Sequence, residues 1–388
     1  MYYLTAGESH GPQLTAIIEG LPAGLKIDIA EVNAALSQRQ GGFGRGDRQK
    51  IEKDQVEFVG GVRHQVTLGG PVALVVKNRD HGNWGEIMSP TAEETAENSQ
   101  RKLVHPRPGH ADLVGGMKYR QRDLRNVLER SSARETTLRV ALGNIAQQFL
   151  RQLDIDLVAY VAQVGPVEAD SEKPLDVSEI RQKILQNDMH VIDQDKVEEL
   201  HQLISETKEN GDTLGGIIRL VATGLPAGLG SYVSWDTKLD AKLAAAAVGV
   251  NAMKGVSFGD GFELGTKFGS QVMDQIDWEK GAGFSRLSDH LGGFEGGMTN
   301  GMPVVMNVAM KPIPTLYQPL QTVDINTKEK HLASVERSDT TSIVAASLVI
   351  QSVIALELAK AICDQFESSS LQRLQEELAR YRQECREY

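Results

Sequence analysis

The hexapeptide GLPAGL occurs twice in the chain, at residues 20–25 and at residues 224–229. The stretch QLTAIIE (13–19) precedes the first copy and IIRLVAT (217–223) precedes the second, and both have the composition of strands. A glycine-rich segment follows each copy, GGFGRG at 41–46 and GGFEGG at 292–297. Because six identical residues are improbable by chance, we predict two structurally related halves, about 1–150 and 210–365, with a larger insertion in the second.

The spacing of apolar residues around these repeats indicates a mixture of helices and strands. Short alternating or apolar runs predict strands at 13–19, 72–77, 217–222 and 304–310. Longer runs predict helices at 29–40, 133–153, 195–209, 238–254, 341–366 and 371–387, and the last is amphipathic, so it should pack on the body or on another subunit. No stretch has the composition of a linker, so we expect an α+β fold in a single domain spanning 1–388.

Composition disfavours several classes of protein. The formal net charge of the chain is −11, which argues against general binding to nucleic acid or anionic lipid. Polar residues interrupt the long apolar run 343–359, so no membrane span is expected, and the lack of a signal-peptide pattern predicts a cytoplasmic protein. Cys363 and Cys385 are too few for a disulfide framework or a zinc cluster, and no dinucleotide, phosphate-loop or metal motif is present.

Positive charge is nevertheless concentrated between residues 101 and 139, a segment that contains ten Lys and Arg residues but only four Asp and Glu residues. A basic region in an acidic protein suggests a pocket for a small anionic ligand. A solvated charged surface explains the same composition, and charge alone does not separate the two interpretations.

Two histidines lie in loops that suit proton transfer. His10 is bracketed by glycines in GESHG, and a histidine exposed there could act as a general acid, although a structural histidine is the simpler interpretation of one pentapeptide. In HPRPGHADL (105–113), Pro106 and Pro108 stiffen a segment that carries Arg107, and Gly109 then exposes His110. This placement of a histidine beside an arginine favours a functional site.

Arginines follow these motifs at two places. Arg39, Arg45 and Arg48 lie on a glycine-rich loop after the first predicted helix, where guanidinium groups could grip carboxylate or phosphate oxygens. In ERSSARET (129–136), Ser132 and Glu135 have the spacing of a capping box, which leaves Arg130 and Arg134 at a helix start that favours an anion.

The second half offers three further segments. VNAMKG (250–255) ends a helix of small residues, and ordinary helix packing explains it most simply. MKPIPTL (310–316) presents Lys311 and Thr315 on a rigid loop suited to a phosphate. ERSDTTS (336–342) precedes the longest apolar helix, so Asp339 is either a helix N-cap or a proton acceptor.

Taken in order, GESHG, the 39–48 loop, RPGHADL, RSSARET, VNAMKG, GGFEGG, KPIPT and RSD resemble the motif series of the chorismate synthase family. They run from residue 7 to residue 339, and RPGHAD with RSSARET is the most specific part. The chain departs from many relatives after Asp339, where it has Thr340, Thr341 and Ser342. The resemblance implies helices sandwiched between two antiparallel sheets with a pseudo-two-fold repeat, and a homotetramer.

The reaction that the resemblance implies is the loss of the 3-phosphate and a C6 proton from 5-enolpyruvylshikimate 3-phosphate to give chorismate, the last common step of the shikimate pathway. Reduced FMN is required, without net oxidation. His10 would protonate the departing phosphate, Asp339 with flavin N5 would take the C6 proton, His110 would set the protonation of the flavin, and Ser9 and Ser132 would orient groups or relay protons.

The resemblance also implies two sets of ligand contacts. The substrate's carboxylates and phosphate would be bound by Arg39, Arg45, Arg48, Arg107 and Arg134. FMN would contact Arg130, Ser131, Ser132, Asn251, Ala252, Gly296, Lys311, Pro312, Ile313, Pro314, Thr315 and Arg337.

Two other functions remain open at this stage. The first is an oxidoreductase that uses FMN and NADPH on an external substrate, and the second is a polyanion or RNA binder that uses residues 101–139. Some relatives reduce their own flavin with NADPH. Since this chain has no dinucleotide motif, we expect a separate flavin reductase to supply reduced FMN.

Overall fold

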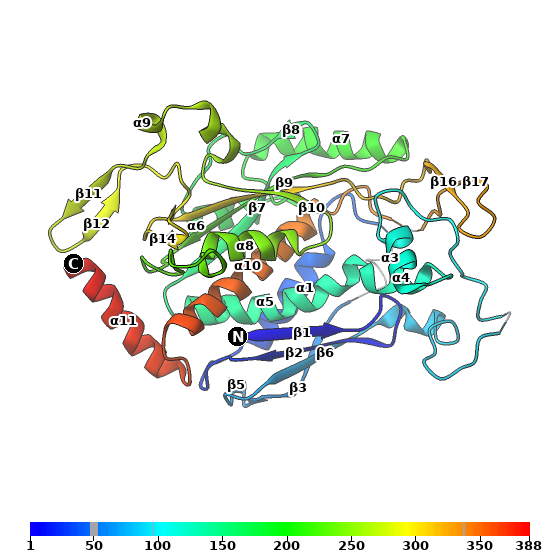
Figure 1. Ribbon diagram of the computed structural model, residues 1–388, viewed down its shortest axis with the longest axis horizontal. Helices are drawn as coiled ribbons and strands as arrows, with labels where there is room; N and C mark the ends of the chain where they lie inside the picture. The colour runs from blue at the N-terminus through cyan, green and yellow to red at the C-terminus, as the bar shows by residue number, and fades with distance from the viewer. Residues whose placement is uncertain (47–52, 96, 337) are drawn as a thin grey trace.

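Two antiparallel sheets enclose a layer of long helices (Figure 1). The computed structural model describes residues 1–46, 53–95, 97–336 and 338–388. Strand order is β1-β2-β6-β3 in the first sheet and β10-β15-β9-β7-β8 in the second. The predicted α+β fold, with helices between two antiparallel sheets, is confirmed.

The first half of the chain contains the first sheet and two of the enclosed helices, α1 and α5. Its strands are β1 (Tyr2–Ala6), β2 (Gln13–Glu19), β3 (Val56–Gly60), β4 (Val62–Arg63), β5 (Val66–Thr67) and β6 (Val72–Lys77). Its helices are α1 (Ile29–Gln40), α3 (Asp112–Tyr119), α4 (Arg125–Ser131) and α5 (Thr136–Arg151), with 3₁₀ turns η1 (Arg79–Asn83) and η2 (Ala133–Glu135). Asp28 caps α1 by accepting from two backbone N–H groups of its first turn.

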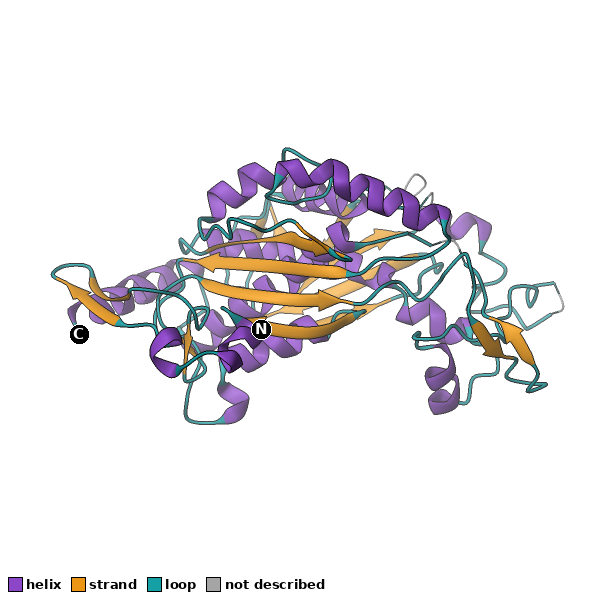
Figure 2. Cartoon of the chain, turned by 90° about the horizontal axis from the view of Figure 1, so that it is seen from above, coloured by secondary structure: helices purple, strands orange, loops and turns teal. Residues whose placement is uncertain are grey.

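The second half contains the second sheet, the enclosed helices α8 and α10, and several short ribbons. Its strands are β7 (Asp156–Val164), β8 (Val167–Glu168), β9 (Gly216–Thr223), β10 (Met253–Phe258), β11 (Ile276–Glu279), β12 (Gly283–Arg286), β13 (Phe294–Glu295), β14 (Met298–Thr299), β15 (Val304–Met310), β16 (Gln321–Val323) and β17 (Lys330–Leu332). Its helices are α6 (Val177–Ile184), α7 (Val197–Glu209), α8 (Leu239–Val248), α9 (Gly269–Val272), α10 (Ile343–Gln365) and α11 (Leu371–Glu387), with 3₁₀ turns η3 (Gln194–Lys196), η4 (Trp235–Thr237) and η5 (Gly261–Thr266). The ribbons β11–β12 and β16–β17 project at opposite ends of the molecule (Figure 2).

The two halves repeat one order of elements, as the duplicated hexapeptide predicts. In the first half β1, β2, α1, β3, β6 and α5 follow one another, and in the second β7, β9, α8, β10, β15 and α10 do. Neighbouring strands also correspond, since β2 pairs with β1 and β6 while β9 pairs with β7 and β15. Because β7 is equivalent to β1, the second half begins near residue 156, earlier than the predicted boundary at 210.

Both copies of GLPAGL are fastened by a buried threonine from a short ribbon. Thr67 donates its hydroxyl to the carbonyl of Pro22 at 2.6 Å and accepts from the backbone N–H of that copy's final leucine at 2.9 Å. Thr299 makes the same two bonds in the second copy, at 2.6 Å to Pro226 and 2.9 Å from the final leucine. The hexapeptide is therefore duplicated because the same turn is built twice.

We expect Thr67→Val and Thr299→Val each to destabilise the protein by about 1–3 kcal/mol, because valine keeps the volume but leaves a buried carbonyl and N–H without their partner. Unfolding in urea measures both. Thr266→Val is the matched control, since this threonine is exposed and should change stability by less than about 0.5 kcal/mol. Loss at only one of the two buried threonines would contradict their equivalence.

Helix α10 is the central element of the core. It is buried on nearly all sides and packs along α5, where Gly143 allows a close approach because a Cβ there would lie 2.2 Å from that of Ser352. The helix is long and apolar enough to cross a membrane, but 83% of its most apolar window is buried inside the protein. A helix that is apolar all round and enclosed by protein is a core helix.

Most predicted elements are confirmed, including the strands at 13–19, 72–77 and 304–310 and the helices at 29–40 and 371–387. Helix α11 packs on the body of its own chain, where Tyr381 donates to the carbonyl of Ala227. The predicted helix 238–254 is wrong at its end, because α8 stops at Val248 and the chain continues into β10. Strand β7 was not predicted.

Candidate active site

The histidine and arginine motifs gather at one end of the molecule, where the β1–β2 loop, α3 and α4 lie beside the segments that follow β15 (Figure 1). His10 contacts Glu129 of α4, and Arg107 contacts Thr315 of the KPIPT segment. Motifs far apart in sequence therefore meet in one place.

His10 is fixed by Glu129. Its Nδ1 lies 2.8 Å from Oε1 and 3.0 Å from Oε2 of the carboxylate, and its backbone N–H donates to Oε2 at 2.9 Å. A carboxylate only accepts hydrogen bonds, so Nδ1 carries the proton. Among the described residues, none forms a hydrogen bond with Nε2, which is thus the nitrogen left for proton exchange with a ligand.

Trp84 covers one face of the His10 ring. The ring centroids are 3.9 Å apart and the planes are stacked at 23°. The guanidinium carbon of Arg101 lies 4.0 Å from the Trp84 ring centroid, and that of Arg125 lies 5.0 Å from it. The imidazole is therefore held between a carboxylate at its edge and an indole on its face.

His110 is fixed in a similar way by Asp112, at 2.6 Å between Nδ1 and Oδ1. Arg107 also binds this carboxylate, through Nε at 2.8 Å and Nη2 at 3.0 Å, and donates from Nη1 to Thr315 at 3.0 Å. Burial alone raises the pKa of Asp112, but hydrogen bonds from His110 and Arg107 outweigh it and hold the pKa well below its usual range. Arg107, predicted to bind substrate, thus joins two motifs of the protein.

The two serines predicted to take part contact each other. The hydroxyl of Ser132 donates to Ser9 at 3.2 Å and accepts from the backbone of Arg134 at 3.3 Å. The predicted reciprocal capping box is wrong in its second half, because Glu135 accepts from Thr5 at 2.7 Å and pairs with Arg139 at 3.0 Å. Only the serine side of the motif acts as a cap, and it caps the 3₁₀ turn η2 that leads into α5.

Two buried arginines and the partly buried Arg45 lie near two carboxylates. Arg134 pairs with Asp54 at 2.6 Å, and Arg45 pairs with Asp339 at 3.0 Å. Arg39 donates to a threonine and a backbone carbonyl near the start of α5. Burial, and then the charge of Arg45, lower the pKa of Arg39 to about 9. Excess positive charge inside the protein favours an anionic ligand.

Asp339 is not a helix N-cap. Ser342 occupies the N-cap position of α10, whereas Asp339 accepts from the backbone N–H of Gly46 at 2.6 Å. The N-cap alternative is therefore wrong, and the carboxylate faces the arginine loop. Two predicted site residues, Arg48 and Arg337, lie outside the described residues.

Most of the described residues that were predicted to contact flavin lie on segments that contact one another, whereas Gly296 does not. Asn251 donates to the carbonyl of Ser131 at 2.8 Å, and the N–H of Lys311 donates to the carbonyl of Ala252 at 3.0 Å. Arg130 donates to backbone carbonyls at the end of β1. Pro312, Ile313 and Pro314 connect Lys311 to Thr315, and the Cβ of Pro314 faces Gly109.

Within a single chain, Gly296 lies away from the other predicted flavin contacts. It connects β13 to β14, and the next residue, Gly297, accepts from the first residue of α8. Asn251 follows the other end of α8, a ten-residue helix of roughly 15 Å. The structure therefore does not place Gly296 beside the other predicted contacts.

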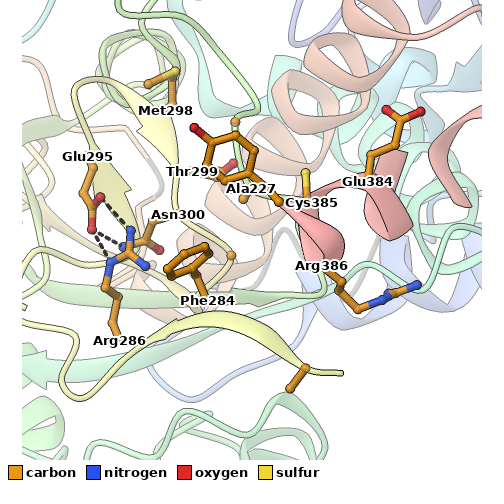
Figure 3. A pocket seen from close by; sticks show the side chains of 14 residues that line it. Ala227, Phe284, Arg286, Glu295, Met298, Thr299, Asn300, Glu384, Cys385 and Arg386 are labelled. Carbon is orange, nitrogen blue, oxygen red and sulfur yellow. Dashed lines mark hydrogen bonds and ion pairs between the residues drawn. The ribbon is translucent and has the colours of Figure 1, made fainter. Parts of the chain in front are cut away.

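A cavity of about 450 Å³ lies beside the β13–β14 ribbon and the end of α11. Figure 3 shows Arg286 and Glu295 facing each other in its wall, where they are 2.6 Å apart, with Phe284 nearby. Its lining holds no histidine. We therefore place the candidate active site at the motif cluster and not in this cavity.

Comparison with known proteins decides the family. A family model described as Chorismate synthase matches residues 1–363. The chorismate synthase of Limosilactobacillus fermentum is 64% identical over 386 residues, covering 100% of this chain and 99% of the relative. The chain belongs to the chorismate synthase family. The chorismate synthase of Lactiplantibacillus plantarum is 61% identical over 386 residues with the same coverage, and a solved structure described as Crystal Structure of Chorismate Synthase matches with a TM-score of 0.80 at 36% identity, covering 100% of this chain and 98% of that chain.

Membership in the chorismate synthase family makes the chain an enzyme, a carbon–oxygen lyase that acts on a phosphate in aromatic biosynthesis. The family and the fold inferred from the motif series are thus confirmed. Sequence reasoning assigned no role to three residues that hold the histidines, Trp84, Asp112 and Glu129. Asp112 lies inside RPGHADL and Glu129 directly precedes RSSARET, whereas Trp84 had no such signal.

Proposed function

We propose that the chain converts 5-enolpyruvylshikimate 3-phosphate into chorismate. In this reaction the C3–O bond breaks and phosphate leaves with the bonding electrons, while C6 loses a proton and the ring gains a double bond. The observation that carries the proposal is the group of Arg39, Arg45 and Arg134, whose positive charge among the described residues exceeds the charge of Asp54 and Asp339. Arg134 also donates to Asn78, which in turn donates to the loop that carries His10.

The substrate is a polyanion, with two carboxylates and one phosphate, and the arginine group supports its binding. Arg45 and Arg39 supply charge at the end of α1, and Arg48 is proposed to add to it. Arg134 and Arg107 are already paired with Asp54 and Asp112, so we assign them mainly to holding the pocket wall and the His110 segment.

The proposed proton transfers follow from the hydrogen bonds. His10, with Nδ1 held by a carboxylate, gives the proton on Nε2 to the departing phosphate. Asp339, which is paired with Arg45, takes the C6 proton. Ser9 and Ser132, in contact with each other, orient these groups.

The residues present fit reduced FMN. Burial and the neighbouring Lys254 lower the pKa of Lys311, which indicates an ammonium that an anionic phosphate would stabilise. Arg130, Asn251 and Thr315 add donors around it, and His110 is proposed to hold the protonation state of the flavin. Reduced FMN, when bound, supplies transient electron donation that assists loss of the phosphate without net oxidation.

The test measures phosphate release under strictly anaerobic conditions, with reduced FMN present in a much smaller amount than 5-enolpyruvylshikimate 3-phosphate. We expect many molecules of phosphate and chorismate per flavin. Stoichiometric flavin oxidation with no phosphate release would instead support the FMN and NADPH oxidoreductase and overturn the proposal. A parallel reaction with oxidised FMN and NADPH tests for self-reduction, and we expect no turnover until a separate flavin reductase is added.

We extend the proposal to a cytoplasmic homotetramer in one compact domain. Exposed aromatic side chains support self-association, including Tyr232, Trp235 and Trp278. Sedimentation of the purified protein measures the assembly.

A further inference from the structure

The carboxylate of Glu129 binds a histidine that is 119 residues away in sequence. It accepts from both the backbone N–H and the Nδ1–H of His10, and the side chain of Glu129 is only 2% exposed. The backbone of α4 adds a third link, since the carbonyl of Glu129 accepts from the N–H of Ser9 at 3.0 Å. Such a set of contacts fixes both the place and the orientation of the imidazole.

Charge at Glu129 is maintained by its surroundings. Burial alone raises its pKa, but hydrogen bonds from His10 and the charge of Arg125 lower it below its ordinary value. Arg125 lies 3.4 Å from Glu129 and 3.0 Å from Glu336. Glu129 is therefore an anion at neutral pH, next to a ring that must carry a positive charge to act as an acid.

Rotation of the ring is restricted at the same time. Trp84 stacks on one face of His10, and the guanidinium of Arg101 lies over Trp84. A carboxylate at Nδ1 keeps the proton on that nitrogen and stabilises the charged ring, so Nε2 is the nitrogen that exchanges a proton.

We propose that Glu129 is the positioning residue of the acid, fixing the Nδ1–H tautomer of His10 and stabilising its imidazolium form, with Trp84 holding the ring plane. This inference rests on the proposed role of His10 as the proton donor to phosphate. Glu129 itself does not touch the substrate.

Glu129→Gln tests the inference, because glutamine keeps the size of the side chain but removes its charge and presents an amide N–H₂ group. We expect kcat to fall about 10–100-fold with KM changed by less than about threefold. The alkaline limb of the kcat profile should move to lower pH, because the charged ring loses its partner. In ¹⁵N NMR of labelled histidines, neutral His10 should change from the Nδ1–H to the Nε2–H tautomer. Glu129→Asp, which restores the charge, should recover part of the lost rate.

Glu336→Gln is the matched control, because Glu336 is a second carboxylate partner of Arg125 and has no contact with His10. It should leave the tautomer and the pH profile unchanged. The positioning role is overturned if Glu129→Gln keeps the Nδ1–H tautomer, or if Glu336→Gln shifts it equally. An unchanged tautomer together with an inactive His10→Asn variant would overturn the positioning role alone, whereas full turnover in His10→Asn would overturn the acid role as well.

Discussion

His10→Asn is expected to lower kcat by about 10²–10⁴-fold, the range in which general acid catalysis contributes, while the protein stays folded. The asparagine amide can take the place of Nδ1 and donate to Glu129, whose carboxylate lies 2.8 Å from that nitrogen. What the substitution removes is Nε2, the nitrogen proposed to protonate the departing phosphate. Steady-state phosphate release with saturating reduced FMN measures the effect.

The His10→Asn prediction separates catalysis from structure. If the variant unfolds more readily but turns over normally once folded, the structural interpretation of His10 is correct. His64→Ala is the control, because His64 is exposed in the turn between β4 and β5, away from the motif cluster. It should leave kcat within about twofold, since a surface substitution away from the site acts on neither binding nor chemistry.

The fold was predictable from the sequence wherever one face of an element is exposed. Strand β2 alternates buried and exposed residues, and α11 buries only Leu371, Leu374 and Leu378 along one stripe. Strand β7 has no such alternation, because α6 covers its second face and makes Val158 and Tyr160 buried as well. A continuous apolar run of this kind resembles a helix as much as a strand.

Helix ends were less predictable. The predicted helix 238–254 ran six residues past the end of α8, which stops at Val248, because apolar residues continue beyond it. Two of them, Val250 in a turn and Met253 in β10, are buried. Ala252 adopts φ +74°, a conformation that no propensity for alanine predicts. The tertiary contacts of β10 with β15 override the local pattern there.

Residues of the site were predictable by type but not by partner. Glycine and proline placement singled out His10 and His110, and charge singled out the arginines. The sequence did not show that Arg107 is committed to Asp112, or that His10 pairs with Glu129, because the second pair is 119 residues apart. Consequently, three arginines that were predicted to bind a ligand are buried and bonded within the protein, namely Arg39, Arg107 and Arg134.

Asp112→Asn is expected to destabilise the protein by about 3–5 kcal/mol, the loss seen when one partner of a buried ion pair is removed. Asp112 is 2% exposed and Arg107 is 7% exposed, so the guanidinium would keep its charge without the carboxylate that neutralises it. His110 would lose its acceptor at 2.6 Å in the same step. Urea unfolding gives the stability change, and turnover of the folded fraction shows how far His110 depends on its orientation.

The effect of Asp112 on stability should also depend on pH. Because the pKa of Asp112 is lower in the folded protein than in the unfolded chain, its contribution is present above about pH 4, the pKa of an unperturbed aspartate, and is lost as pH falls toward the folded value. The stability difference between the wild type and Asp112→Asn should therefore shrink below about pH 4. Glu57→Gln is the control, since Glu57 pairs with Lys77 at an exposed position and should cost less than about 1 kcal/mol at any pH. An Asp112→Asn loss no larger than that of Glu57→Gln would show that Arg107 finds another partner, and that the Arg107–Asp112 pair does not hold the His110 segment in place.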